Sequence, residues 1–390
     1  MYGMKIHEIA RSALYFILLF ASLSLLAESD RLPPMEKLDI QLEFKDDLHF
    51  EHMLKAISRQ EVYFKKKDLK VPIQIGERKL KREHLYKSLK EFRTLVVAAL
   101  NCFQVSKSST CYNDFKEQMQ RKFEVYRPIP EEWERGAADK KTMFTAYYSP
   151  DLHGSMVQTD VYKNPIYAMP TDEKLARATS DEINYGGKLK NKGLELLYVK
   201  ESLYDIWLLH VEGGGRVILE DDQGKKTHKY LSYKSSNKKS FSMLYEYMLA
   251  EGMLTKGAAT ISKQRKYFIN HPEHQREILN SCESFIFFQI TESEPLGVHN
   301  IPLTEQRSLA TDYRRVKEYG MINFIKTKKP IFDNGEMRKE EFSRFFINQD
   351  TGGAIKGNAR VDLYFGYGDK AELAANFVYG LGEQYYLILK

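Results

Sequence analysis

The apolar residues of this chain follow a helical period in some stretches and a strand-like pattern in others, and the order of these stretches strongly constrains the fold. The period is helical over 83–103 and 112–123, strand-like from about 142 to 233, helical again over 240–254, 263–270 and 274–281, and strand-like from 285 onward. The two flanking parts share a pattern that the middle lacks. We therefore predict a mainly β fold with helices (α+β), in which a second domain is inserted.

The predicted domain limits follow from this order. The chain has 390 residues, more than a single domain usually holds. We assign residues 28–147 and 241–390 to one discontinuous domain, and residues 148–240 to an inserted β domain. Inside the middle part, short apolar runs predict strands at 143–148, 194–199, 206–211 and 217–219. The polar and basic stretch 221–239 is typical of a solvated hairpin or loop.

The first 27 residues have the pattern of an export signal. Lys5 and Arg11 precede the apolar run 13–26, and small residues follow it. Cleavage after Ser24 and cleavage after Ala27 are both compatible with the pattern, and so is an uncleaved signal that anchors the chain. No Cys lies near the end of the run, so a lipid-modified N-terminus is not expected. We expect the protein in the periplasm or cell envelope.

The sequence has three cysteines and does not decide whether two of them form a disulfide. Cys102 and Cys111 flank a short segment that resembles a turn between two helices, and in an oxidising compartment they could form a disulfide. Two ordinary buried thiols are an equally good interpretation. Cys282 is expected to be a buried thiol without reactivity.

Charge and motifs exclude several classes of function. The 59 basic and 53 acidic residues leave a net charge of only +6, which does not indicate a nucleic-acid partner. The turn 213–215 lacks the Lys-Ser/Thr pair of a phosphate-binding loop, and Pro272 interrupts the helix that His271 and His274 would need to bind zinc together. No nucleophilic Ser or Cys motif occurs. We expect no metal and no other cofactor.

A glycine-rich segment near the C-terminus holds two candidate acidic groups. Asp350 and Asp362 lie in QDTGGAIKGNARVDLYFGYGD (349–369), which reads as two strands joined by a tight turn that could bring the two carboxyl groups together. The apolar neighbours Val361, Leu363 and Phe365 would raise the pKa of a half-buried carboxyl group, as a general acid requires. The alternative is a turn whose Asp residues cap backbone amides, and the pattern alone favours it.

The same segment resembles the three-aspartate (3D) domain of the membrane-bound lytic transglycosylase A (MltA) family. The stretch PLTEQRSLATD (302–312) is similar to the first aspartate motif of that domain, so Asp312, Asp350 and Asp362 fit its three aspartates. Four upstream stretches resemble further motifs of the family in the same order: FTAYYSP (144–150), NPIYAMP (164–170), IWLLHVEGGGR (206–216) and ESFIFF (283–288). The resemblance runs from about residue 144 to 390 and implies a double-psi β-barrel with a smaller β-barrel domain inserted, and a groove between the two for a glycan.

The resemblance also implies the reaction. A family member cleaves the β-1,4 bond between N-acetylmuramic acid (MurNAc) and N-acetylglucosamine (GlcNAc) in peptidoglycan without water and leaves a 1,6-anhydro ring. Asp362 would serve as acid and then as base. Asp312, Asp350 and Lys356 would support it, with Asp350 orienting nearby backbone amides or the loop of Lys356. We expect glycan strands as the substrate and a monomeric enzyme, with cell-wall proteins as further candidate partners.

Five further residues are candidates for contact with the glycan. Thr145, Tyr147 and Tyr148 would offer hydroxyls and rings to the sugars, and Glu212 with Gly214 would let the glycan pass close to the backbone. Simple strand packing is the alternative. The family more often has Gln at the position of Glu212, so the contact assigned to Glu212 departs from the family pattern. The stretch 313–330 is a second departure, because RRVKEYG (314–320) stands where relatives run quickly into a turn and a strand, and we expect the barrel to tolerate it.

Two other functions stay open at this point. A water-using glycosidase would employ Asp350 and Asp362 as a pair of carboxyl groups. A wall-binding module would use the same surface without catalysis. The products released from peptidoglycan separate the three hypotheses.

Overall fold

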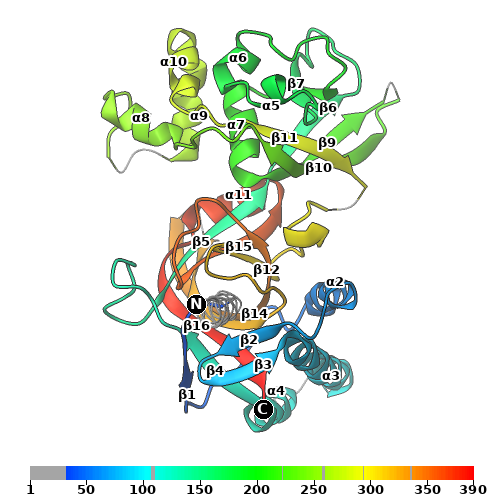
Figure 1. Cartoon of the computed structure of the whole chain (residues 1–390), viewed down its shortest axis with the longest axis vertical. Coiled ribbons are helices and arrows are strands. Elements are labelled where there is room, and N and C mark those ends of the chain that lie inside the picture. Colours follow the sequence, from blue (N-terminus) through cyan, green and yellow to red (C-terminus); the bar gives the residue numbers. More distant parts are fainter. Residues whose placement is uncertain (1–31, 107–109, 222, 257–259, 293, 334–335) are drawn as a thin grey trace, which may run out of the picture. The chain divides into compact units, whose positions relative to one another are not determined.

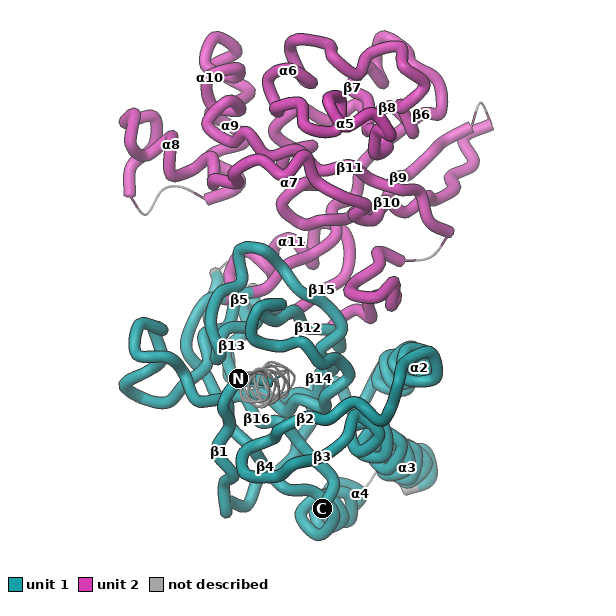
Figure 2. The backbone as a smooth tube through the Cα atoms, viewed as in Figure 1, with its two compact units in different colours: residues 1–145, 307–362, 379–390 teal, residues 146–306, 363–378 magenta. Residues whose placement is uncertain are grey.

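The computed structural model describes residues 32–106, 110–221, 223–256, 260–292, 294–333 and 336–390. These residues form two compact units, shown in different colours in Figure 2. Unit 1 holds the described residues up to 145 together with those of 307–362 and 379–390, and unit 2 holds the described residues of 146–306 and 363–378. The predicted export signal lies outside the described residues. No helix within the described ranges is long and apolar enough to cross a membrane.

Unit 1 holds most of a closed barrel of six strands, two of which continue into residues grouped with unit 2. The barrel strands, in spatial order, are β16 (Tyr379–Leu389), β13 (Ile322–Asp333), β14 (Glu336–Thr351), β12 (Ser308–Thr311), β15 (Arg360–Tyr367) and β5 (Thr142–Ser149). Residues Thr142–Thr145 of β5 pair with β16 and close the circle. Two further strands, β4 (Phe123–Pro128) and β1 (Met35–Leu38), extend the sheet beyond β16. This barrel, together with the helices, confirms the predicted fold class.

Three helices cover part of the barrel, as Figure 1 shows. They are α2 (Met53–Lys65), α3 (Arg82–Ser106) and α4 (Thr110–Lys122), and a small hairpin of β2 (Pro72–Ile75) and β3 (Arg78–Lys81) precedes α3. The ring of Phe345 on β14 lies 5.0 Å from that of Phe92 on α3 and 5.7 Å from that of Phe115 on α4. These aromatic contacts join the predicted amphipathic helices to the barrel. Cys102 and Cys111 form a disulfide between the end of α3 and the start of α4, while Cys282 is a buried free thiol.

Unit 2 contains a second six-stranded sheet. Its strands, in spatial order, are β11 (Ile286–Thr291), β10 (Lys226–Ser236), β9 (Gly214–Glu220), β6 (Asp151–Ser155), β8 (Glu195–Val199) and β7 (Asn164–Tyr167). A bridge between Ala168, next to β7, and Phe288 of β11 links the two edges of the sheet. Its helices are α5 (Glu173–Ala176), α6 (Ser180–Asn184), α7 (Leu203–Glu212), α8 (Leu244–Ala250), α9 (Ile261–Asn270), α10 (Gln275–Asn280) and α11 (Gly368–Phe377), with short 3₁₀ turns at Pro272–His274 and Val298–Asn300.

The predicted strand at 206–211 is wrong, because these residues belong to the helix α7. Ser202 and Asp205 form a capping box at its start, and Gly213 ends it with a positive φ of 72°. The helix is apolar on two faces: Ile206 and Leu209 pack on the sheet, and Tyr204, Trp207 and Leu208 pack on other helices. Such a continuous apolar run has no helical period to reveal it.

Two other sequence predictions differ from the structure. Within the predicted loop 221–239, residues 226–236 form the strand β10, which lies between β9 and β11 and has Leu231 fully buried. The sequence also assigned residues 241–306 to the barrel domain, whereas the structure groups them with unit 2. The reason is packing, since Leu244, Phe268 and Ile278 of α8, α9 and α10 share a buried cluster with Trp207 of α7.

Candidate active site

Asp362 lies on the barrel strand β15 between two fully buried apolar residues. Val361 and Leu363 are at most 1% exposed, whereas the side chain of Asp362 is 20% exposed. Successive residues of a strand point to opposite faces, so the apolar neighbours that the sequence indicated turn away from the carboxyl group. The carboxyl group is half-buried and reachable, as an acid that meets a substrate must be.

One oxygen of the Asp362 carboxylate is held by two donors. Thr145 Oγ1 on the neighbouring strand β5 and Arg360 Nη1 on β15 both donate to Oδ1. Both donors that reach this carboxylate from the described part of the chain bind Oδ1, so Oδ2 is left for a ligand. The structure thus brings together two of the predicted residues, Thr145 and Asp362. Arg360 was not predicted; its spacing of two residues from Asp362 on one strand was the available signal.

Asp312 directly follows β12 and joins two loops. Its Oδ1 accepts hydrogen bonds from Arg314 N at 2.9 Å and Arg314 Nε at 2.7 Å, and its Oδ2 accepts from Arg314 Nη2 at 3.0 Å and Gly357 N at 2.9 Å. Burial acts to raise the pKa of Asp312, but Arg314 and the Gly357 amide outweigh it and hold the pKa below its ordinary value. Asp312 is therefore an ionised anchor for the loop that precedes β15.

The loop 352–359 connects the strands of Asp350 and Asp362. Arg314 Nη2 also donates to Ile355 O at 2.8 Å, which fixes the loop beside the exposed Lys356. Asp350 lies near the end of β14, and its backbone pairs with Ala310 of β12. Asp312 and Arg314 thus both contact the loop that carries Lys356. The roles of Asp350 and Lys356 stay predictions.

The remaining predicted residues lie in unit 2. Tyr148 N donates to Glu212 Oε2 at 3.3 Å, so these two residues are brought together. Burial is the largest cause that raises the pKa of the Tyr148 phenol far above its ordinary value, followed by the charges of Glu212 and Glu372. The ring of Tyr147 packs at 5.1 Å from that of Tyr364. Tyr148 is 1% exposed, whereas Tyr147 is half-buried and the better candidate for contact with a sugar.

Gly214 has a packing reason that the sequence did not reveal. A Cβ at this position would lie 2.8 Å from Leu231 O and 3.1 Å from the ring of Pro295. The space that a side chain would need at Gly214 is therefore already filled by β10 and by the segment after β11. A Cβ at Gly213 would meet no atom within 4 Å, and the positive φ of 72° at Gly213 is the conformation that ends α7.

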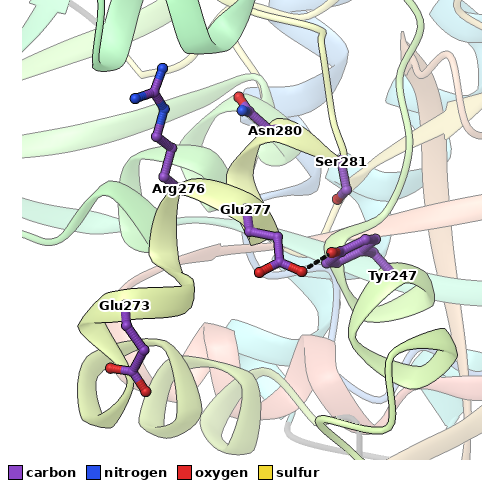
Figure 3. A pocket seen from close by; sticks show the side chains of 6 residues that line it. All are labelled: Tyr247, Glu273, Arg276, Glu277, Asn280 and Ser281. Carbon is purple, nitrogen blue, oxygen red and sulfur yellow. Dashed lines mark hydrogen bonds between the residues drawn. The ribbon is translucent and has the colours of Figure 1, made fainter.

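A surface hollow lies away from these residues, in unit 2. It has a volume of about 730 Å³ and is lined by residues of α8, α10 and their neighbours, which Figure 3 shows: Tyr247, Glu273, Arg276, Glu277, Asn280 and Ser281. Tyr247 Oη donates to Glu277 across it. None of the predicted site residues lines this hollow, and its walls are side chains of a shallow surface between short helices. We assign the candidate site to the barrel strands instead.

Two models of known protein families match the chain. Residues 143–289 match the MltA-specific insert domain, and residues 307–387 match the 3D domain. The chain belongs to the MltA family. The two matched ranges of this MltA family member contain Thr145, Tyr147, Tyr148, Glu212 and Gly214 in the first and all three predicted aspartates in the second.

Individual relatives agree with the MltA assignment. The membrane-bound lytic murein transglycosylase A of Vibrio cholerae is 32% identical over 245 residues, which are 62% of this chain and 64% of that protein. The chain thus spans somewhat less than two thirds of the length of this curated relative. Two crystal structures share the fold. Escherichia coli MltA with bound chitohexaose has a TM-score of 0.70 and 19% sequence identity, and the match covers 93% of this chain and 96% of that one. A membrane-bound lytic murein transglycosylase from Agrobacterium tumefaciens has a TM-score of 0.68 and 21% sequence identity, and the match covers 91% of this chain and 98% of that one.

Proposed function

We propose that this protein is a peptidoglycan lytic transglycosylase that cleaves the β-1,4 bond between MurNAc and GlcNAc and leaves a 1,6-anhydro ring on MurNAc. The observation that carries the proposal is the single carboxyl group of Asp362, half-buried on a barrel strand of the 3D domain, with donors on one oxygen only. The names of the relatives support the reaction, and the chitohexaose bound to the Escherichia coli protein supports a glycan substrate.

Asp362 would act in two steps. The protonated Oδ2 first donates its proton to the glycosidic oxygen while the bond from that oxygen to C1 of MurNAc breaks. The carboxylate then accepts the proton of the C6 hydroxyl, whose oxygen forms the new bond to C1. The proton count of Asp362 is restored, and no water is consumed. Thr145 and Arg360, which both bind Oδ1, keep Oδ2 directed at the reacting atoms through both steps.

A carboxyl group that acts alone is what distinguishes the proposed reaction from hydrolysis. A water-using glycosidase needs a second carboxyl group, placed roughly 5 to 9.5 Å from the first, as nucleophile or as base for water. The partners that the structure gives Asp362 are a hydroxyl group and a guanidinium group. Asp350 is the rival carboxyl group, and its backbone is bound to β12 at the end of β14.

Glycan contacts would come from side chains that offer rings and hydroxyls. Tyr147 is half-buried with its ring against Tyr364, and a ring held in this way can stack on a sugar face. Thr145 would contact the substrate through its position beside Asp362. Glu212 is held by the amide of Tyr148, so its carboxylate would offer an acceptor to sugar hydroxyls, with Tyr148 as its support.

The proposed location is the cell envelope, reached by the N-terminal export signal. The disulfide between Cys102 and Cys111 supports an oxidising compartment, because such bonds are rare in the reducing cytosol. The Vibrio cholerae relative is membrane-bound by name. Purification of the exported protein and mass spectrometry of its N-terminus will separate cleavage after Ser24 or Ala27 from a retained anchor.

The test of the function is the chemistry of the products. Purified sacculi are digested with the protein, and the muropeptides are analysed by mass spectrometry. We expect 1,6-anhydro ends, whereas products about 18 Da heavier with reducing ends identify a hydrolase. Binding to sacculi without soluble products would identify a wall-binding module.

Two matched variants test the assignment of the acid. We expect Asp362→Asn to lower the rate by at least about 10²-fold, since a positioned acid and base contributes about 10² to 10⁴. Asp350→Asn should keep anhydro products at a reduced rate. An Asp362→Asn variant that digests sacculi as fast as the wild type would refute the assignment, and an Asp350→Asn variant as inactive as Asp362→Asn would favour the two-carboxylate hydrolase.

A further inference from the structure

A fourth carboxylate lies against the segment that leads into β15. Glu134 follows β4 in a turn outside both matched domain ranges, and it is only 7% exposed. Its Oε1 accepts a hydrogen bond from Ala359 N at 2.8 Å, and its Oε2 accepts from Asn358 N at 3.0 Å and from Glu131 N at 2.6 Å. All three donors are backbone amides. A buried carboxylate with such donors fixes the chain segments that supply them.

Two carboxylates together bind three successive amides. Asp312 accepts the hydrogen bond of Gly357 N, and Glu134 accepts those of Asn358 N and Ala359 N. Gly357 has a φ of 115°, and a Cβ at this position would lie 2.3 Å from Glu134 Oε1. The backbone therefore approaches Glu134 as closely as it does only because residue 357 is glycine.

The amides held by Glu134 also fix the register of the active strand. Ala359, which donates to Glu134, accepts a hydrogen bond from Met143 N of β5 at 2.9 Å. Thr145 lies two residues beyond Met143 on β5, and Asp362 lies three residues beyond Ala359 on β15. Glu134 therefore fixes the place where β5 and β15 begin to run side by side. Further along these two strands, Thr145 donates its hydrogen bond to Asp362.

We propose that Glu134 is a positioning residue for Asp362. The inference rests on the proposed function, in which Asp362 transfers the proton. Glu134 does not touch the substrate; it holds Asn358 and Ala359 in place so that the Asp362 carboxylate keeps its hydrogen bond to Thr145. Displacement of a reacting group by about 1 Å can lower a rate by about 10²-fold. Loss of the Glu134 carboxylate should therefore lower kcat more than it weakens glycan binding.

The variant Glu134→Gln tests the proposal, because an amide group keeps the size of the side chain and loses one acceptor. Glu124→Gln is the matched control. Glu124 is a 12% exposed carboxylate on β4 of the same unit. It pairs with Arg78 of β3 and Lys37 of β1, and β4 is not a neighbour of β15 in the sheet. Both variants should unfold at a lower temperature than the wild type. Only Glu134→Gln should lower kcat on sacculi, by about 10- to 10²-fold, with KM within about twofold of the wild type.

Hydrogen exchange supplies a readout that does not depend on activity. Deuterium uptake of a peptide that covers residues 355–363 should rise in Glu134→Gln and stay unchanged in Glu124→Gln. Unchanged uptake, unchanged kcat, or an equal loss of kcat in the control would overturn the proposal. If Glu134→Gln does not fold, Gly357→Ala replaces it, since the added Cβ displaces the same carboxylate. A wild-type protein that cleaves no glycan would refute the proposed function, whereas the exchange result would still decide whether Glu134 fixes this segment.

Discussion

Replacement of Asp312 by Asn should destabilise unit 1 to an extent that the structure lets us estimate. Each oxygen of Asp312 binds one backbone amide, Arg314 N on Oδ1 and Gly357 N on Oδ2. Whichever way the Asn amide turns, its NH₂ group faces one of these amides and leaves it without an acceptor. A buried N–H group without a partner costs about 1 to 3 kcal/mol. The lost charge at Arg314 adds at most about 1 kcal/mol, because that side chain is 41% exposed.

We therefore expect the free energy of unfolding of unit 1 to fall by about 1 to 4 kcal/mol in Asp312→Asn. The measurement is urea unfolding followed by tryptophan fluorescence in a Trp207→Phe background. The chain has two Trp residues, and Trp133 lies in unit 1 whereas Trp207 lies in unit 2. In that background the fluorescence reports on unit 1 alone.

A matched variant separates the two contributions. Arg314→Ala removes the exposed cation and leaves both amides bonded to Asp312, so it should cost at most about 1 kcal/mol. If Arg314→Ala destabilises unit 1 as much as Asp312→Asn, the surface ion pair and not the amide contact is what matters. A loss below about 1 kcal/mol in Asp312→Asn would also contradict the estimate.

Two further predictions concern unit 1. Folding lowers the pKa of Asp312 from its ordinary value of 3.8. The contribution of Asp312 to stability is therefore complete above pH 3.8 and is lost as the pH falls through the lower folded-state pKa. In acid unfolding experiments, the difference in stability between the wild type and Asp312→Asn should shrink over this range. Reduction of the disulfide between Cys102 and Cys111 should lower the free energy of unfolding by about 2 to 3 kcal/mol, and a double Cys→Ser variant at these positions should show no further change on addition of reductant.

The sequence predicted the helices and strands in which apolar and polar residues follow a regular period. It did not predict a helix that is buried on two faces. The amphipathic pattern over 83–103 corresponds to α3, which has one buried face. The helix α7 is buried on two faces and carries no such pattern, but Ser202, Asp205 and Gly213 were signals of its ends. The strand β10 was missed because its exposed Lys and His residues mask the alternation.

Only the site residues that lie in recognised motifs could be predicted from the sequence. The motif resemblance gave the three aspartates and Thr145, and the structure places Thr145 beside Asp362. It could not show that Asp312 accepts the hydrogen bond of Gly357 N, because a motif contains no distances. Glu134 carries no motif at all. Its contacts with Asn358 and Ala359 join residues more than two hundred positions apart in the chain, which periodicity cannot detect.

The contacts of Glu134 have a consequence for the design of expression fragments. The matched domain ranges begin at residue 143, so a fragment cut there would keep Asp312, Asp350 and Asp362. It would also lack β1, β4 and the turn that carries Glu134. With them it would lose one of the partner strands of β16 and the carboxylate that accepts from Asn358 N and Ala359 N. A truncated protein of this kind would retain every motif residue of the proposed catalyst and lose the support that places its acid.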